Sequence, residues 1–235
     1  MRSLVLVLCL VLSLPAMADR LLVAAGAGYK KPLTEIYAAF TEETGIGVDA
    51  AFGNMQQVLA QTRDSGRVDL VVGEQGFLRK SGLFNRFEPL GTGRLVLAYG
   101  RQRLDSWQDI ADPSIERIAL PDPKKAIYGR AATQFLERSG LMPQVKERLM
   151  TLATVPQVSA YLLAGTVDVG FINVTDALGI AEKIAGFDEL PADLYDPPRI
   201  VLAFPTSAGQ TDAAEALATF VSSDQARAIF KRFGL

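Results

Sequence analysis

A strand, a glycine turn and the start of a helix follow one another near the beginning of the chain, and this succession limits the fold more than any other feature. Leu21–Ala25 is a short apolar run, typical of a strand covered on both faces. Gly26 and Gly28 allow a sharp turn that leaves backbone N–H groups uncovered, and Pro32 suits a first helical turn. One apolar helical face then follows at intervals of three and four residues: Leu33, Ile36, Tyr37 and Phe40.

The turn presents uncovered N–H groups and the positive end of a helix dipole above the end of the strand. We therefore expect an anion there, in contact with the backbone of Gly28 and Tyr29. Lys30 and Lys31 follow directly. Cations in a first turn oppose the helix dipole, which favours a ligand-binding role for at least one lysine over a solvated surface position.

The first 18 residues have the pattern of a secretory signal peptide. Arg2 supplies a positive start, residues 4–14 are almost entirely apolar, and Ala16-Met17-Ala18 is a typical cleavage site. An apolar run of about 11 residues is too short for a bilayer, which needs about 20. We expect cleavage after Ala18 and a mature chain of 217 residues (235 − 18).

The composition excludes several classes of protein. The chain has no histidine, and its one cysteine, Cys9, lies in the expected signal peptide. Mechanisms that depend on histidine or cysteine are therefore excluded from the mature chain. Without Arg2 the chain has 23 basic and 26 acidic side chains, a net charge of −3 that does not suit nucleic-acid binding. These observations favour a binding protein over an enzyme.

Strand and helix patterns alternate along the chain with short connections, which predicts an α/β fold with mostly parallel sheets. We expect further strands at residues 48–52, 68–73, 95–99, 115–120, 167–172 and 200–204. We expect helices over residues 57–64, from 127, over 143–152, from 156 and over 175–184, and two closing helices capped near Thr211 and Ser223. Residues 90–94 and 186–198 are expected to be loops.

Six segments also carry a resemblance to a known family through their order and spacing. They are the opening strand with Ala24-Ala25, Val48–Phe52 with Gly53, Val68–Val71, Leu120–Pro123 with Ala126–Gly129, Val169–Ile172 with Thr175-Asp176-Ala177, and Gln225–Leu235. Together they resemble the periplasmic molybdate-binding proteins of ABC importers, within the type II periplasmic solute-binding protein superfamily.

The resemblance implies two α/β lobes joined by two crossing strands, with the ligand in the cleft between them. Lobe 1 would comprise residues 19–98 and 203–235, and lobe 2 residues 99–202. It also implies a periplasmic monomer without catalysis, cofactor or metal, which captures a small anion for an ABC permease of the inner membrane. Ligands of open α/β sheets bind at the carboxyl ends of strands, and hinge closure is the expected motion.

By register, the chain departs from the family at three ligand positions. The family typically offers serine, serine and tyrosine where this chain has Gly28, Met55 and Asn173. Lysines near these turns could replace the missing donors, and they favour a larger or more highly charged anion: Lys30, Lys31, Lys124 and Lys125. The sequence leaves open whether the anion is molybdate.

The candidate ligand-binding residues lie where strands end and helices begin: Gly28, Tyr29, Lys30, Lys31, Asn54, Met55, Lys125, Ala126, Ile127, Val155 and Asn173. Backbone N–H groups would supply the directional donors, and Asn173 with one or more lysines would complete the site. Structural roles compete with these assignments. Both asparagines could cap helices, Tyr29 and Ile127 could belong to the core, and the lysines could be solvated.

Three alternatives remain open at the level of the sequence. The same scaffold could hold a metal, a metal chelate or an organic acid, provided that Tyr29 and Tyr128 converge with acidic residues. An enzyme would need a carboxylate pair or a lysine in the cleft, and no such motif stands out. A sensory or accessory binding protein would present its solute to a receptor in place of a permease.

Overall fold

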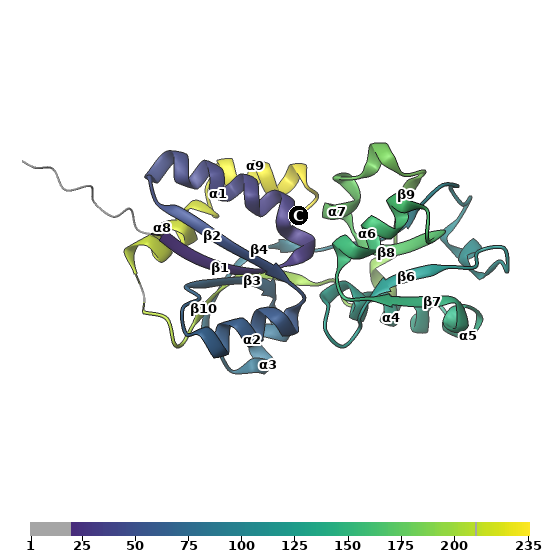
Figure 1. Cartoon of the computed structure of the whole chain (residues 1–235), viewed down its shortest axis with the longest axis horizontal. Coiled ribbons are helices and arrows are strands. Elements are labelled where there is room, and N and C mark those ends of the chain that lie inside the picture. The colour runs from purple at the N-terminus through teal and green to yellow at the C-terminus, as the bar shows by residue number, and fades with distance from the viewer. Residues whose placement is uncertain (1–19, 210) are drawn as a thin grey trace, which may run out of the picture.

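The computed structural model describes residues 20–209 and 211–235, which form two lobes side by side (Figure 1). Each lobe contains one five-stranded sheet, with helices packed against it. The expected two-lobed α/β fold is therefore confirmed. The expected signal peptide, residues 1–18, lies outside the described residues.

Lobe 1 has the strand order β2-β1-β3-β10-β4. The strands are β1 (Arg20–Gly26), β2 (Gly47–Gly53), β3 (Leu70–Glu74), β4 (Phe84–Thr92) and β10 (Arg199–Pro205). The helices are α1 (Lys30–Thr44), α2 (Met55–Ser65), α3 (Gln75–Ser81), α8 (Asp212–Phe220) and α9 (Asp224–Arg232). Figure 1 shows α1 and α9 on one face of the sheet and α2 and α3 on the other.

The opening stretch of lobe 1 folds as predicted. β1 is an inner strand of the sheet, between β2 and β3, and a 3-10 turn, η1 (Ala27–Tyr29), joins it to α1. The predicted apolar face of α1 is buried, with Leu33, Ile36 and Phe40 at most 1% exposed. The start of α1 is thereby fixed above the carboxyl end of β1.

Lobe 2 has the strand order β7-β6-β8-β5-β9. Its strands are β5 (Leu95–Tyr99), β6 (Ile118–Pro121), β7 (Leu149–Leu152), β8 (Val169–Asn173) and β9 (Gly186–Glu189). Its helices are α4 (Ile127–Arg138), α5 (Met142–Val145), α6 (Val155–Ala164) and α7 (Val174–Leu178). Its 3-10 turns are η2 (Trp107–Ala111), η3 (Lys146–Arg148), η4 (Ala181–Lys183) and η5 (Ala192–Leu194).

The sheets are mixed, so the prediction of mostly parallel sheets holds for only half of the strand pairs. In lobe 1, β1 is parallel to β2 and β3, but β10 is antiparallel to β3 and β4. Lobe 2 repeats this pattern, with β6 parallel to β7 and β8, and β5 antiparallel to β8 and β9. The antiparallel strand at the fourth place of each sheet, β10 or β5, is the one that enters from the other lobe.

The chain crosses between the lobes twice, from β4 to β5 and from β9 to β10. The two crossing segments are joined where Gly93 N–H donates to the Pro198 carbonyl at 2.8 Å. The expected lobe boundaries at 98/99 and 202/203 fall inside β5 and β10, and each of these strands pairs within a single sheet.

Three further differences concern β4, β7 and β9, which lie at sheet edges. The helix expected over residues 143–152 ends early, because α5 and η3 lead into β7. β4 extends into the expected loop at 90–94, and β9 forms within the expected loop at 186–198. Most residues of β7 and β9 are only partly buried, so their sequences lack the continuous apolar runs of the central strands.

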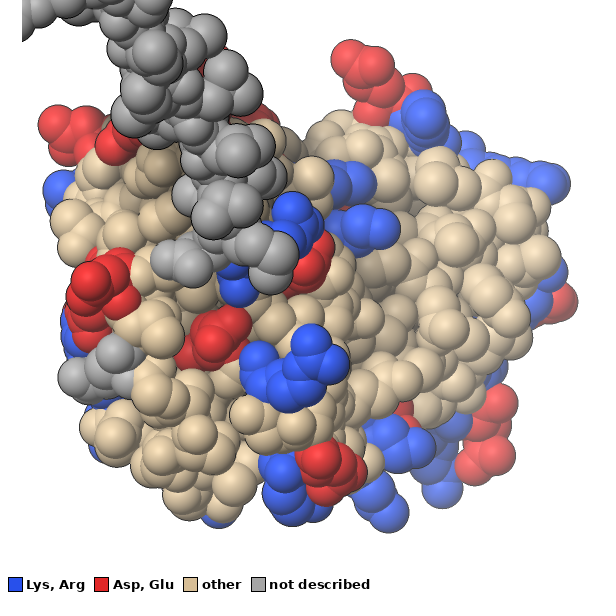
Figure 2. Space-filling model, turned by 60° about the vertical axis from the view of Figure 1, so that its left-hand side comes forward, with Lys and Arg blue, Asp and Glu red and all other residues tan. Residues whose placement is uncertain are grey.

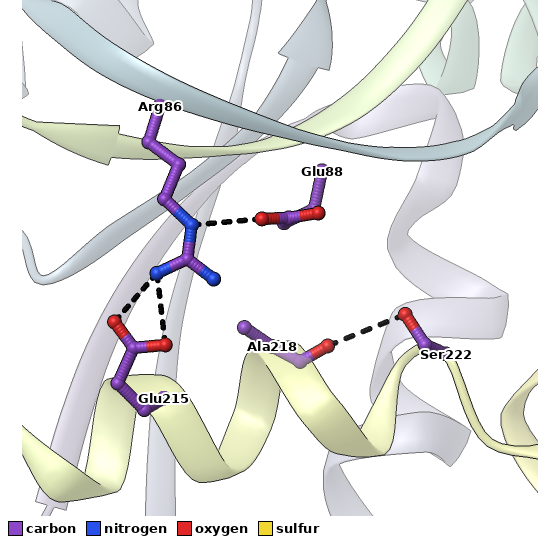
Figure 3. Close-up of polar contacts among 5 residues, drawn as sticks. All are labelled: Arg86, Glu88, Glu215, Ala218 and Ser222. Carbon is purple, nitrogen blue, oxygen red and sulfur yellow. Dashed lines mark hydrogen bonds and ion pairs between the residues drawn. The ribbon is translucent and has the colours of Figure 1, made fainter.

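The predicted caps of the two closing helices are confirmed: Thr211 caps α8, and Ser223 caps α9. An ion pair fixes α8 to the sheet of lobe 1 (Figure 3): Arg86 on β4 binds Glu215 of α8 at 2.6 and 2.8 Å and Glu88 at 2.7 Å. The Arg86 guanidinium also lies 4.2 Å from the centre of the Phe204 ring on β10. The end of the chain therefore belongs to lobe 1.

Candidate functional site

The starts of four helices meet between the lobes. In lobe 1, η1 with α1 follows β1, and α2 follows β2; in lobe 2, α4 follows β6, and α6 follows β7. These starts line one cavity with Gly26, Ala27, Gly28, Tyr29, Gly53, Asn54, Met55, Ala126, Ile127, Tyr128, Thr154 and Val155. The lining includes the predicted residues Gly28, Tyr29, Asn54, Met55, Ala126, Ile127 and Val155.

All residues of the lining are uncharged, so its electrostatic field comes from the backbone. The first N–H groups of a helix have no acceptor within that helix. Each helix start carries about half a positive charge, so four of them offer roughly two positive charges. The helix starts therefore favour an anion in the cavity without a cationic side chain.

The lobes are close together around this cavity. It measures about 20 Å³ as the space open to the centre of a water molecule. A single water needs about 10–15 Å³, so an ion with four oxygens can enter this cavity only when the lobes part. One of the contacts across the cleft joins Met55 N–H to the Lys125 carbonyl at 2.8 Å.

The residues of the α2 start have structural partners. Asn54 Oδ1 accepts from Gln57 N–H at 3.0 Å, and Gln57 Oε1 accepts from Asn54 N–H at 2.9 Å, which is a complete capping box. The Met55 side chain is 1% exposed and packs against Gly73, at which a Cβ would lie 2.6 Å from Met55 Cε. Asn54 therefore caps α2, and the Met55 side chain fills the space over Gly73.

Two tyrosines join the lobes behind the cavity. The hydroxyls of Tyr29 and Tyr128 are 2.6 Å apart, and both side chains are buried. Burial raises the pKa of both phenols above the ordinary value. Both hydroxyls lie against Gly93 of the crossing segment, where a Cβ would be 2.0 Å from Tyr128 Oη. Gly93 is thus required for this close packing.

Sequence reasoning missed five lining residues: Gly26, Ala27, Gly53, Tyr128 and Thr154. Tyr128, at the start of α4, is buried and also borders the cavity. Thr154 caps α6 by accepting from Gln157 N–H at 3.4 Å. The signal for Thr154 was present, since a threonine two residues before Pro156 is a typical helix start.

The predicted lysines are outside the lining and have other partners. Lys30 Nζ lies 5.9 Å from the centre of the Phe52 ring, and Lys31 Nζ lies 3.4 Å from Asp176 Oδ1. Lys125 Nζ lies 3.2 Å from Asp122 Oδ2. Burial alone would raise the pKa of Asp122. The Lys124 N–H and the Lys125 ammonium lower it by more than burial raises it, so the pKa of Asp122 lies below its usual value.

Asn173 lies beside the cavity but does not line it. Its side chain is fully buried, and Nδ2 donates to the Gly28 carbonyl at 3.0 Å across the cleft. A Cβ at Gly28 would lie 3.1 Å from Asn173 Oδ1, so the asparagine occupies the space beside this glycine. Two of the three positions that depart from the resembled family, Gly28 and Asn173, are thus in direct contact.

Other kinds of site find less support. Residues 20–209 and 211–235 hold no group of three or more histidines, cysteines, aspartates and glutamates placed to bind a metal. No helix in this part of the chain is long and apolar enough to cross a bilayer. On the face in Figure 2, basic and acidic side chains of the described residues are interspersed.

The sequence was compared with known protein families. Residues 21–235 match the family model of the bacterial extracellular solute-binding proteins. The chain belongs to this family. Its members are binding proteins rather than enzymes, in agreement with the prediction from composition.

Relatives of this solute-binding protein support the resemblance. The chain is 27% identical to the molybdate-binding protein ModA of Rhodobacter capsulatus, over 97% of this chain and 93% of the relative. A binding protein of Haemophilus influenzae is 30% identical, over 78% of each chain. The solved periplasmic molybdate-binding protein of Azotobacter vinelandii matches 91% of this chain and 97% of its own, with 25% identity and a TM-score of 0.84. These findings confirm the resemblance and the type II fold.

Proposed function

We propose that this solute-binding protein captures a compact, doubly charged tetrahedral oxyanion between its lobes and delivers it to an ABC permease. The convergence of four helix starts, two from each lobe, on one uncharged cavity carries the proposal. A hydrogen bond to a charged group contributes about 1.5–3 kcal/mol, so several N–H donors suffice for tight binding. Both lobes are needed, because each supplies only two of the four helix starts.

The character of the lining narrows the class of anion. Three of the four lysines that favoured a larger or more highly charged guest contact other groups: Lys125 at Asp122, Lys31 at Asp176 and Lys30 at the Phe52 ring. Neutral backbone donors suit a small dianion such as molybdate, tungstate or sulfate. Relatives named for molybdate binding support this class, and the sulfate-binding protein SubI of Mycobacterium tuberculosis shares the fold at 15% identity with a TM-score of 0.77.

The rest of the proposed biology follows from the family and from the sequence. The signal peptide would be cleaved after Ala18 and the mature monomer released into the periplasm. From the membership of the two sheets, we assign residues 20–92 and 199–235 to lobe 1 and residues 95–198 to lobe 2. A permease of the inner membrane would recognise the closed form.

A thermal-shift screen of the mature chain, followed by titration calorimetry, tests the function. The panel contains molybdate, tungstate, sulfate, phosphate, chloride, citrate and several divalent metals. An anion at 100 times its Kd adds about 2.7 kcal/mol of stability, which raises Tm by several degrees. We expect at least one tetrahedral dianion to do so, and chloride and the metals to have no effect. Failure of every oxyanion would refute the proposal.

Removal of a single backbone donor tests the geometry. Proline is tolerated at the first position of a helix, where it only removes an N–H. Ile127 begins α4 after a residue with extended backbone, so Ile127→Pro deletes one donor without distorting the helix. We expect the anion affinity to fall roughly tenfold to a hundredfold, together with a lower Tm because the buried Ile127 side chain is also lost. Ile127→Ala loses the same packing but keeps the N–H, so its affinity should be closer to that of the unaltered chain.

A matched substitution at a helix start far from the cavity serves as the control. Asp224 begins α9 after the extended Ser223. Asp224→Pro should leave the affinity measured by calorimetry unchanged. If Ile127→Pro binds the anion as well as Asp224→Pro does, the start of α4 is no part of the site.

A further inference from the structure

The first turn of α7 joins lobe 2 to lobe 1 through polar side chains. Figure 1 shows α7 at the side of lobe 2 that faces α1. Asn173, directly before α7, donates to the Gly28 carbonyl of η1 at 3.0 Å. Asp176, in the first turn, lies 3.4 Å from Lys31 Nζ of α1. Both lobe 1 partners belong to the stretch that begins α1.

Asn173 holds the capping position of α7 but does not cap it. Its side chain makes no cap hydrogen bond, and its buried Oδ1 has no partner among the described residues. Asn54 holds the same position before α2, and its Oδ1 does accept from the third N–H of that helix. The Asn173 side chain therefore forms a hydrogen bond to the other lobe and does not cap α7.

Asp176 and Lys31 form the second contact across the cleft. Asp176 is 5% exposed and also accepts a hydrogen bond from the Ser159 hydroxyl of α6. The Lys31 side chain lies over Gly179 at the end of α7, where a Cβ would come within 2.1 Å of Nζ. Its Nζ is also 3.5 Å from the Asp176 carbonyl. Lys31 therefore reaches along α7 and turns away from the cavity.

We propose that the first turn of α7 is a latch that holds the lobes closed. Lys31, Asn173 and Asp176 are positioning residues that set the affinity for the anion without touching it. When the lobes part, Asn173 loses Gly28 and becomes free to cap α7, as Asn54 caps α2, while Lys31 returns to water. The sequence suggested that Lys31 contacts the ligand, whereas here Lys31 holds the lobes closed. This role of Lys31 in setting the anion affinity rests on the proposed function.

The latch has a measurable consequence for affinity. A ligand that binds the closed form has an apparent Kd equal to the intrinsic Kd divided by the closed fraction. A partly buried ion pair contributes more than an exposed one, so its loss should weaken binding by roughly threefold to tenfold. The loss should act on every anion equally, because the latch does not contact the bound ion.

Adjacent lysines provide a matched pair of variants. Lys31→Ala removes the latch, whereas Lys30→Ala removes a lysine with no partner in lobe 2 among the described residues. The mature chain has no cysteine, so Glu43→Cys in lobe 1 and Lys183→Cys in lobe 2 allow labelling for single-molecule energy transfer. Without added anion, Lys31→Ala should lower the closed fraction several-fold, and Lys30→Ala should leave it unchanged.

Dissociation rates provide the second readout. With the anion identified by the screen, Lys31→Ala should release it roughly three to ten times faster, with the ratio of affinities for molybdate and sulfate unchanged. Asp176→Asn should give the same change, and the double variant should add nothing further. This non-additivity identifies the pair as one contact.

Three results would overturn the latch. The first is a closed fraction and a release rate in Lys31→Ala equal to those of the unaltered protein. The second is a change in the ratio of affinities, which would mean that Lys31 contacts the anion. The third is an equal effect of Lys30→Ala, which would indicate a general effect of surface charge. Because the energy-transfer measurement needs no anion, it tests the latch even if the proposed function fails.

Discussion

Met55, Ile127 and Val155 are buried apolar residues at the starts of α2, α4 and α6, and all three border the cavity. The Met55 side chain fills the space over Gly73, and a Cβ at Gly26 would lie 3.6 Å from Ile127 Cδ1 and 3.8 Å from Met55 Sδ. At the scale of the residue, these cavity positions are occupied by apolar side chains, so hydrogen-bond donors to an anion would have to come from the backbone.

The cap of α2 gives a prediction at this scale. Loss of a capping side chain costs about 1 kcal/mol, so Asn54→Ala should lower the free energy of unfolding by that amount. Urea unfolding of the mature chain measures the change. Asn54→Ser keeps an oxygen that can cap and should restore most of the stability. Equal losses for both variants would show that the amide has another role.

The buried tyrosine pair predicts a loss of stability in alkali. The pKa of Tyr29 and of Tyr128 is raised by burial, so the folded protein binds these protons more tightly than the unfolded chain, in which the pKa is about 10.0. The stabilisation is complete below pH 10 and decreases as the pH rises above it, by about 1.4 kcal/mol per pH unit for each phenol.

Urea unfolding at pH 8, 10 and 11 tests this sign. The double variant Tyr29→Phe with Tyr128→Phe serves as the comparison, because it removes both phenols and leaves no hydroxyl of the pair without its partner. We expect its stability to decline less between pH 10 and 11 than that of the unaltered chain. Parallel declines would mean that other groups dominate the alkaline transition.

At the scale of the element, the sequence predicted central strands and capped helices well and edge strands poorly. β1, β8 and β10 are buried runs with clear patterns, and α8 and α9 have the expected caps. β7 and β9 lie at edges, where partial burial removes the apolar signal. The antiparallel direction of β5 and β10 depends on the crossing between lobes, which no local pattern encodes.

The close packing of α4 against the end of β6 predicts that one added methyl group, at Gly129, strongly destabilises the protein. Gly129 lies in the first turn of α4, and a Cβ there would be 2.2 Å from the Pro121 carbonyl oxygen and 2.6 Å from the Asp122 carbonyl carbon. Backbone atoms cannot rotate away, so Gly129→Ala must displace α4. We expect a loss of about 2–4 kcal/mol in the free energy of unfolding and a weaker affinity for the anion.

The control for this prediction is Gly209→Ala. A Cβ at Gly209 meets nothing within 4 Å, and its backbone conformation is open to alanine. Its free energy of unfolding should match that of the unaltered chain. A stability of Gly129→Ala equal to that of this control would show that α4 has room to move.

At the scale of the whole molecule, the two-lobed fold could be predicted, but the contacts between the lobes could not. The glycine turns and helix starts indicate an anion site because their local chemistry is explicit in the sequence. The partners of Lys31 and Asn173 depend on how the lobes meet, so the sequence suggested ligand contacts for both. That most predicted residues line one cavity supports the site, which stays a prediction until an anion is observed there.

A crystal structure of the mature chain with its tightest-binding oxyanion tests the central claim most directly. The account predicts an anion enclosed by residues 26–29, 53–55, 126–128 and 154–155, with backbone N–H groups of both lobes donating to its oxygens and Lys31 bound to Asp176. An anion held elsewhere, or held by lysine side chains in place of the helix starts, would contradict the account.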